Sequence, residues 1–170
     1  MKNEINKTSS VSSHPPADYS AKPNRNAEDQ VIRHALTILS SRVQKGDVLN
    51  SPQQTKDYLA LQLSDMKQEL FCALWLNSKN QVMEFQTLFA GTIDGAPVYP
   101  REVVREAIRI NAAAVIFAHN HPSGYAEPSN ADKKITVRLS EALGLIDVRT
   151  LDHIIIGGAS SVSLAERGII

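Results

Sequence analysis

An unbroken apolar run, Ala112 to Ala118, is the feature that most restricts how this chain can fold. The run is too short for most helices, and polar residues bound it on both sides, so it predicts a strand buried in the centre of a sheet. Such a strand needs a core around it. With 170 residues, of which 42% are hydrophobic, the chain fits one domain plus some sequence outside its core.

Strand and helix patterns alternate along the rest of the chain. The strand pattern recurs at residues 70–76, 82–89 and 148–156. Apolar residues at helical spacing recur near residues 31–39, 52–61, 100–108 and 135–143. This alternation is typical of α/β or α+β proteins, and we expect a central mixed sheet flanked by helices.

Residues 1–26 are polar and rich in serine and proline. Such a segment cannot bury enough apolar surface to offset the entropy lost on ordering, so we expect a disordered arm. It lacks the apolar core of a signal peptide, and no apolar run in the chain is long enough to span a bilayer. We therefore predict a cytoplasmic protein with no membrane partner. Its predicted parts are the arm (1–26), a helical segment (27–49) and a main domain (50–170).

Cysteine content and charge exclude several kinds of protein. The single cysteine, Cys72, excludes an internal disulfide and a cysteine-based zinc finger. Its apolar surroundings favour a small buried side chain, with a catalytic thiol as the alternative. Basic and acidic residues balance at 18 each, which does not support a nucleic-acid partner, although local basic patches stay open.

Two histidines, His119 and His121, follow the apolar run directly. Residues i and i+2 of a strand point to the same face, so both imidazoles can converge on one point. Pro122 and Gly124 then turn the chain, and Asp132, in the first turn of the next helix, could return to that point. Two histidines and one carboxylate would leave one position of a tetrahedral zinc open for water, as in a catalytic site.

Simpler interpretations of these residues compete with the metal site. Paired histidines on a loop can be surface residues or ordinary hydrogen-bonding groups. Ser129 and Asp132 also fit a helix capping box, with Ser129 as the cap and Asp132 near the positive end of the helix. A capping role for Ser129 does not exclude the metal site, because capping would orient Ser129 beside the metal.

The spacing of His119, His121, Ser129 and Asp132 matches the JAMM motif residue for residue. From about residue 50 to residue 170, the chain resembles the RadC-like (UPF0758-type) branch of the JAMM/MPN+ superfamily. The matching segments occur in the family's order: LFAGT at 88–92, PREV at 100–103, NAAA at 111–114, HNHPSG at 119–124 and LDHIIIG at 151–157.

This resemblance implies a JAB1/MPN-like, cytidine-deaminase-like fold and a Zn²⁺ site held by His119, His121 and Asp132. It also implies a metallopeptidase activity in a catalytic domain over 50–170, with a protein or peptide as substrate. Full-length RadC proteins carry a helical, helix-hairpin-helix-like module before that domain. About 25 residues with a helical pattern precede residue 50 here, too few for that module.

A JAMM site also needs an upstream glutamate, which takes a proton from the zinc-bound water and delivers it to the leaving amine. Glu69 and Glu84 are the candidates. We favour Glu69, because it lies where a predicted helix passes into a predicted strand, as the JAMM glutamate does. Either could instead be a solvated strand-edge carboxylate. Many RadC-like sequences carry a glutamate at the position of Gln86, and the glutamine argues against a base at that position.

Three further polar side chains are candidates for the neighbourhood of the site. Ser129 would donate a hydrogen bond to the oxyanion that develops on the attacked carbonyl. Ser123 is a lesser candidate for the rim. His153 could orient a ligand from behind or be a satisfied core histidine at a strand end, and the sequence favours the second.

The residues support three hypotheses about function. The first is a zinc peptidase or isopeptidase that cleaves an amide bond. The second is a DNA-associated protein, of repair or of a mobile element, whose metal domain binds rather than cleaves, and the neutral charge disfavours it. The third is a pseudoenzyme that acts as an interaction module, and the intact His119, His121 and Asp132 argue against it.

Overall fold

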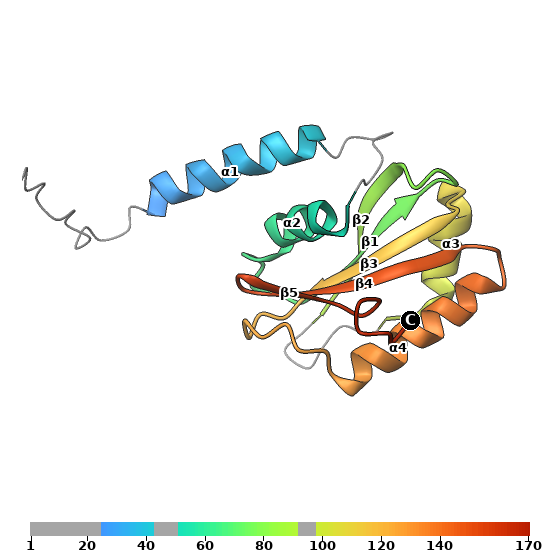
Figure 1. Ribbon diagram of the computed structural model, residues 1–170. Helices are drawn as coiled ribbons and strands as arrows, with labels where there is room; N and C mark the ends of the chain where they lie inside the picture. The colour runs from blue at the N-terminus through green and yellow to red at the C-terminus, as the bar shows by residue number, and fades with distance from the viewer. Residues whose placement is uncertain (1–24, 43–50, 92–97) are drawn as a thin grey trace, which may run out of the picture.

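The computed structural model describes residues 25–42, 51–91 and 98–170. Its helices are α1 (Arg25–Arg42), α2 (Pro52–Leu63), α3 (Pro100–Ile110) and α4 (Asn130–Gly144). Its strands are β1 (Leu70–Leu76), β2 (Val82–Ala90), β3 (Ala114–Asn120), β4 (Arg149–Gly157) and β5 (Ser160–Ser163). The five strands form one sheet in the order β2-β1-β3-β4-β5, with β3 and β4 parallel and the other neighbours antiparallel. The predicted fold class, a mixed sheet flanked by helices, is confirmed (Figure 1).

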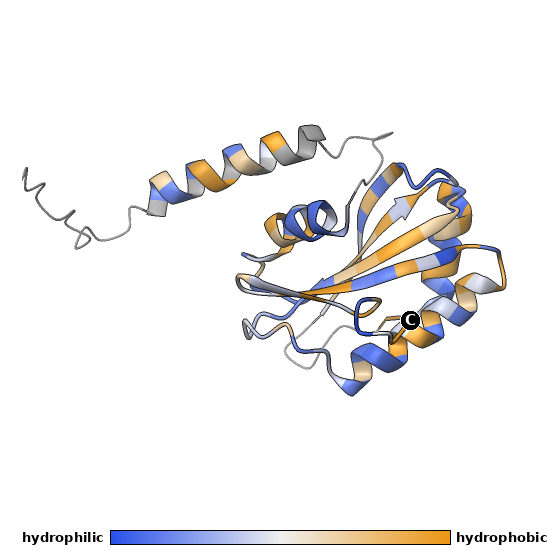
Figure 2. Ribbon diagram, in the orientation of Figure 1, coloured by the Kyte–Doolittle hydropathy of each residue, from blue (hydrophilic) through white to orange (hydrophobic). Residues whose placement is uncertain are grey.

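The sheet separates two apolar cores, because successive side chains of a strand point to opposite faces. On one face, Cys72, Leu74 and Leu76 of β1 pack in a cluster with α2. On the other face, Ala73 and Trp75 pack in a cluster with α3 and α4. Apolar residues accordingly gather on the central strands and on the sides of the helices that face them (Figure 2). Cys72 is a buried free thiol, as expected.

The apolar run forms the central strand, and every residue of β3 is buried. The strand nevertheless lies two residues later than predicted. Asn111 ends α3 in the left-handed conformation, with φ at 57°, and the N–H of Ala112 bonds to the carbonyl of Ala107, so Ala112 is tied to the helix end. At the other end, the pairing with β4 continues through His119 and Asn120. His119 and Asn120, which lie beyond the predicted strand, are therefore strand residues.

The apolar pattern of the sequence did not predict every element and boundary. α1 lies beside α2, away from the sheet (Figure 1). It begins at Arg25, and most of the predicted arm and the end of the predicted helical segment (27–49) lie outside the described residues. The short edge strand β5 was not predicted, because its four residues, three of them serines, give no apolar alternation. Among the described helices, none is both long and apolar enough to cross a membrane.

Candidate metal centre

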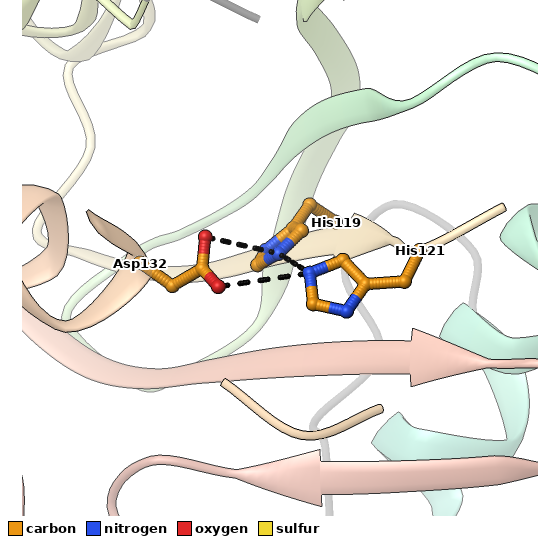
Figure 3. Close-up of side chains that lie close together, drawn as sticks. All are labelled: His119, His121 and Asp132. Atoms are coloured by element: carbon orange, nitrogen blue, oxygen red, sulfur yellow. Dashed lines mark hydrogen bonds and ion pairs between the residues drawn. The ribbon is translucent and has the colours of Figure 1, made fainter. Parts of the chain in front are cut away.

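The two histidines of the motif lie at the carboxyl end of β3. His119 is the sixth residue of the strand, and His121 follows its last residue. The N–H of His121 donates to the carbonyl of Ile156 at 2.8 Å, so the hydrogen bonding to β4 extends as far as His121. Both side chains therefore point the same way, and their Nε2 atoms are 2.8 Å apart (Figure 3).

Asp132 reaches the same point from the first turn of α4. Ser129 caps this helix: its Oγ accepts from the N–H of Asp132 at 3.1 Å, while its own N–H and O–H donate to Asp132 Oδ2 at 2.7 and 2.6 Å. The predicted capping box is thus present, and it fixes the carboxylate beside the histidines. Burial raises the pKa of the Asp132 carboxyl, but hydrogen bonds from His121 and Ser129 and the nearby His119 outweigh it, and the net pKa lies far below the usual range.

The loop after β3 orients His121. The Nδ1 atom of His121 lies 2.7 Å from the carbonyl oxygen of Tyr125. Close packing on β4 holds this loop, since a Cβ atom at Gly157 would lie only 2.3 Å from the backbone nitrogen of Ala126. The hydrogen bond to Asp132 raises the pKa of His121 against the opposing effect of partial burial.

His119 is enclosed, at 1% exposure. Burial lowers its pKa to about 4, although the charge of Asp132 acts in the opposite direction. His119 is therefore neutral near pH 7, which is the form that binds a metal. Behind it lies His153, fully buried, whose pKa burial and His119 lower well below the usual value.

The donor atoms of His119, His121 and Asp132 suit a divalent metal ion. Asp132 Oδ1 lies 3.4 Å from His119 Nε2, and Asp132 Oδ2 lies 3.6 Å from His121 Nε2. Ligand atoms at about 2.0–2.1 Å from a tetrahedral zinc lie roughly 3.3–3.4 Å from one another. Small shifts of these side chains would therefore satisfy that geometry, and two imidazole nitrogens with one carboxylate oxygen are donors that zinc accepts.

Glu69 lies beside this cluster, just before β1. It lines an open cavity of about 510 Å³ together with a set of residues that includes His121: Lys67, Gln68, Gly91, His121, Pro122 and Ser123. Burial raises the pKa of the Glu69 carboxyl, the positive charge of His121 lowers it, and the negative charge of Asp132 raises it, with a net rise. Glu69 is thus within electrostatic reach of two of the three possible metal ligands.

Comparison with known proteins identifies the family of this chain. Residues 49–169 match the RadC-like JAB domain. The chain belongs to the RadC-like JAB domain family. This confirms the family predicted from the motif, one related to the JAMM superfamily.

Several UPF0758 proteins are similar to this RadC-like chain. That of Vibrio cholerae serotype O1 is 50% identical over 147 residues, which cover 86% of this chain and 93% of the relative. That of Cellvibrio japonicus is 54% identical over 138 residues, or 81% and 62% of the two chains. That of Halorhodospira halophila is 56% identical over 157 residues, or 89% and 70%. The chain therefore spans less than two thirds of the length of the second of these relatives.

The second candidate glutamate of this RadC-like domain lies elsewhere. Glu84, on β2, is 3.3 Å from the Arg109 guanidinium on α3. Gln86 accepts from the indole N–H of Trp75 at 3.0 Å and donates to Glu106 at 3.1 Å. Both side chains thus belong to polar contacts between β2 and its neighbours, whereas Glu69 lines the cavity. The assignment of Glu69 as the base stays a proposal.

Sequence interpretation did not single out Asn120, the residue between the two histidines. Its side chain is 2% exposed and points to the opposite face. Its amide donates to the carbonyls of Met66 and Gln68 at 3.1 and 3.0 Å, and its oxygen accepts from the N–H of Leu70 at 2.9 Å. Asn120 therefore ties the segment that carries Glu69 to the strand that carries the histidines. The available signal was an amide in an apolar strand, since a buried amide must be hydrogen-bonded.

Proposed function

We propose that this RadC-like JAB domain is a zinc-dependent hydrolase that cleaves an amide bond in a protein or peptide. The observation that carries the proposal is the convergence of His119, His121 and Asp132. His121 and Glu69 line the same open cavity. When bound by such a set, zinc keeps one coordination position open, polarises a carbonyl and lowers the pKa of water. The remaining work falls to the side chains around it.

In this proposal, Glu69 takes a proton from the attacking water and passes it to the leaving amine. Its raised pKa supports this role, because a carboxyl whose pKa is nearer the working pH can both accept and return a proton. Its position supports the role too, since Glu69 and His121 line the same cavity. Lys67 and Gln68 line that cavity next to Glu69 and would contact the substrate backbone or side chains.

Ser129 has two tasks in the proposal. Its hydroxyl has one proton, which it donates to Asp132 Oδ2 at 2.6 Å. To donate to the oxyanion of the substrate instead, the hydroxyl must rotate away from Asp132. The carboxylate would then keep the N–H of Ser129 as a partner at 2.7 Å. Ser129 thus holds the carboxylate before the reaction and can turn to the substrate during it.

Metal analysis followed by peptide-library cleavage tests the proposal. Protein purified without chelator should contain one zinc per chain, and His121→Ala should abolish zinc uptake. Glu69→Gln should keep zinc and fold but lose about 10²–10⁴-fold in hydrolysis, because the amide cannot accept the proton. Glu84→Gln is the matched control and should cleave at the wild-type rate, since Glu84 contacts Arg109 instead of the cavity.

The possible outcomes separate this proposal from its main alternative. Absence of zinc after titration would refute the metal site and, with it, the hydrolase. Zinc binding without cleavage of any peptide would favour a RadC-like metal-binding protein that associates with DNA in repair or on a mobile element. A Glu84→Gln variant that loses activity while Glu69→Gln keeps it would reverse the assignment of the base.

A further inference from the structure

A series of buried, hydrogen-bonded groups, called the file below, begins at Nδ1 of His119, the ring nitrogen that faces away from Asp132. His119 Nδ1 lies 2.8 Å from His153 Nε2, and His153 Nδ1 lies 2.5 Å from Thr136 Oγ1. Thr136 Oγ1 in turn lies 2.6 Å from the backbone oxygen of Asp132. All three residues are at most 1% exposed, so water does not compete for these bonds. The file joins β3, β4 and α4, and both of its ends are residues of the metal centre.

Hydrogen-bond chemistry fixes the direction of each proton in this file. The backbone carbonyl of Asp132 can only accept, so the Thr136 hydroxyl donates its single proton there. Thr136 Oγ1 must then accept from His153 Nδ1–H, which leaves Nε2 of the neutral His153 without a proton. His119 Nδ1 must donate to that bare nitrogen. His119 therefore presents an unprotonated Nε2 to the metal centre.

A single contact fixes the Nδ1 proton of His121. Its Nδ1 lies 2.7 Å from the carbonyl of Tyr125, which can only accept. Nδ1 of both histidines thus holds a proton, and both Nε2 atoms face a common point beside Asp132 (Figure 3). Since these Nε2 atoms lie 2.8 Å apart, one of them holds a proton in the metal-free protein, and this is His121 Nε2, because His119 Nε2 is bare. A histidine binds a metal through an unprotonated nitrogen, and the partner of its other nitrogen selects which one that is.

We infer that Thr136 and His153 are positioning residues that hold His119 in the one tautomer able to bind a metal through Nε2. The inference rests on the proposed metal site. Without these partners, Nε2 would hold the proton in part of the molecules, and a metal would have to displace it. The ring of His153 is kept in line by Phe71 and Phe117, whose ring centroids lie 5.3 and 6.1 Å away at steep angles.

The first test observes the tautomer in the metal-free, full-length protein. In a sample labelled with ¹⁵N-histidine, ring nitrogen chemical shifts distinguish a protonated nitrogen from a bare one. We expect His119 and His153 both to be protonated at Nδ1 and bare at Nε2. His119 protonated at Nε2 and bare at Nδ1 would overturn the inference. This measurement needs no variant and no zinc, so it is decisive even if a substituted protein fails to fold.

The second test removes the Thr136 hydroxyl from the file. Thr136→Val keeps the shape of the side chain and deletes the hydroxyl, and zinc affinity measured against a competing chelator should fall about 10–100-fold. Thr150→Val is the matched control, because Thr150 Oγ1 is buried without a hydrogen-bond partner among the described residues. Its zinc affinity should equal that of the wild type. Equal affinities of the two valine variants would overturn the inference.

The third test compares two substitutions of His153. Glutamine can offer an oxygen near the place of Nε2 and so accept from His119 Nδ1–H, whereas leucine offers no acceptor. His153→Gln should therefore bind zinc more tightly than His153→Leu. Equal losses in both, with the wild-type tautomer retained at His119, would mean that His153 only fills space, and the inference would fall. If the wild type takes up no zinc, the proposed function fails, and the tautomer measurement still decides the role of the file.

Discussion

Replacing Gly157 with alanine would place a methyl group against the loop that orients His121. A Cβ atom on this backbone would lie 2.3 Å from the nitrogen of Ala126 and 2.5 Å from the carbonyl carbon of Tyr125. Ordinary contact begins near 3.4 Å, so the loop or the end of β4 would have to move by about 1 Å. Overpacking of this kind costs about 1–3 kcal/mol. A protein of this size loses about 2–4 °C per kcal/mol, so the melting temperature should fall by about 2–12 °C.

The same movement should weaken zinc binding, because the displaced carbonyl of Tyr125 holds His121 Nδ1 at 2.7 Å. Loss of such a partner typically costs about 10–100-fold in metal affinity. Gly144→Ala is the matched control: nothing lies within 4 Å of its added Cβ, and a helical alanine stabilises by up to about 1 kcal/mol. Thermal unfolding and chelator competition measure both effects. A Gly157→Ala protein that melts and binds zinc like the wild type would refute this reasoning.

Three further predictions concern stability. Metal-free protein should lose stability from about pH 6.5 towards pH 4, because burial lowers the pKa of His119 to about 4 and that of His153 further, so the unfolded chain binds protons that the fold excludes. His121 opposes this loss of stability, since its hydrogen bond to the Asp132 carboxylate raises its pKa. Constant stability in denaturant melts between about pH 6.5 and pH 4 would contradict the prediction. Asn120→Ala should lower the free energy of unfolding by about 2–4 kcal/mol, since the three hydrogen bonds of this buried residue are lost, and should reduce hydrolysis more than zinc affinity. Removal of residues 1–26 should leave the melting temperature and zinc content unchanged, and a loss of several degrees would show that this segment docks on the domain.

The fold was predictable as far as apolar pattern alone decides it. A run with no polar face, such as Ala114 to Ala118, can only be central, and the structure places it between β1 and β4. The end of that strand was not predictable in the same way. His119 and Asn120 are polar and belong to a buried strand because partners from distant segments satisfy them. A polar residue gives no local sign that such partners exist.

The residues of the candidate site likewise fall into two groups, those that local sequence rules could place and those that only contacts between distant segments could place. His119, His121 and Asp132 could be brought together from strand alternation and a helix start, both of which are local rules. Thr136 and His153 could not be placed at the site in this way, because the contact between them joins residues 17 positions apart in the chain. The sequence offered two interpretations of His153, a core residue or an orienting residue, and the structure makes them compatible. His153 is buried, and its Nε2 lies 2.8 Å from His119 Nδ1.

The capping box of α4 makes one carboxylate serve two structures. Asp132 Oδ2 closes the first turn of the helix, while Oδ1 faces His119. Opening of that turn would withdraw the carboxylate, and an ion that holds the carboxylate would keep the turn closed. By linkage, an ion at about 100 times its Kd would make such opening roughly 100-fold rarer. The amide hydrogens at the start of α4 would then exchange with solvent at a rate that reports how much of the protein is loaded with metal.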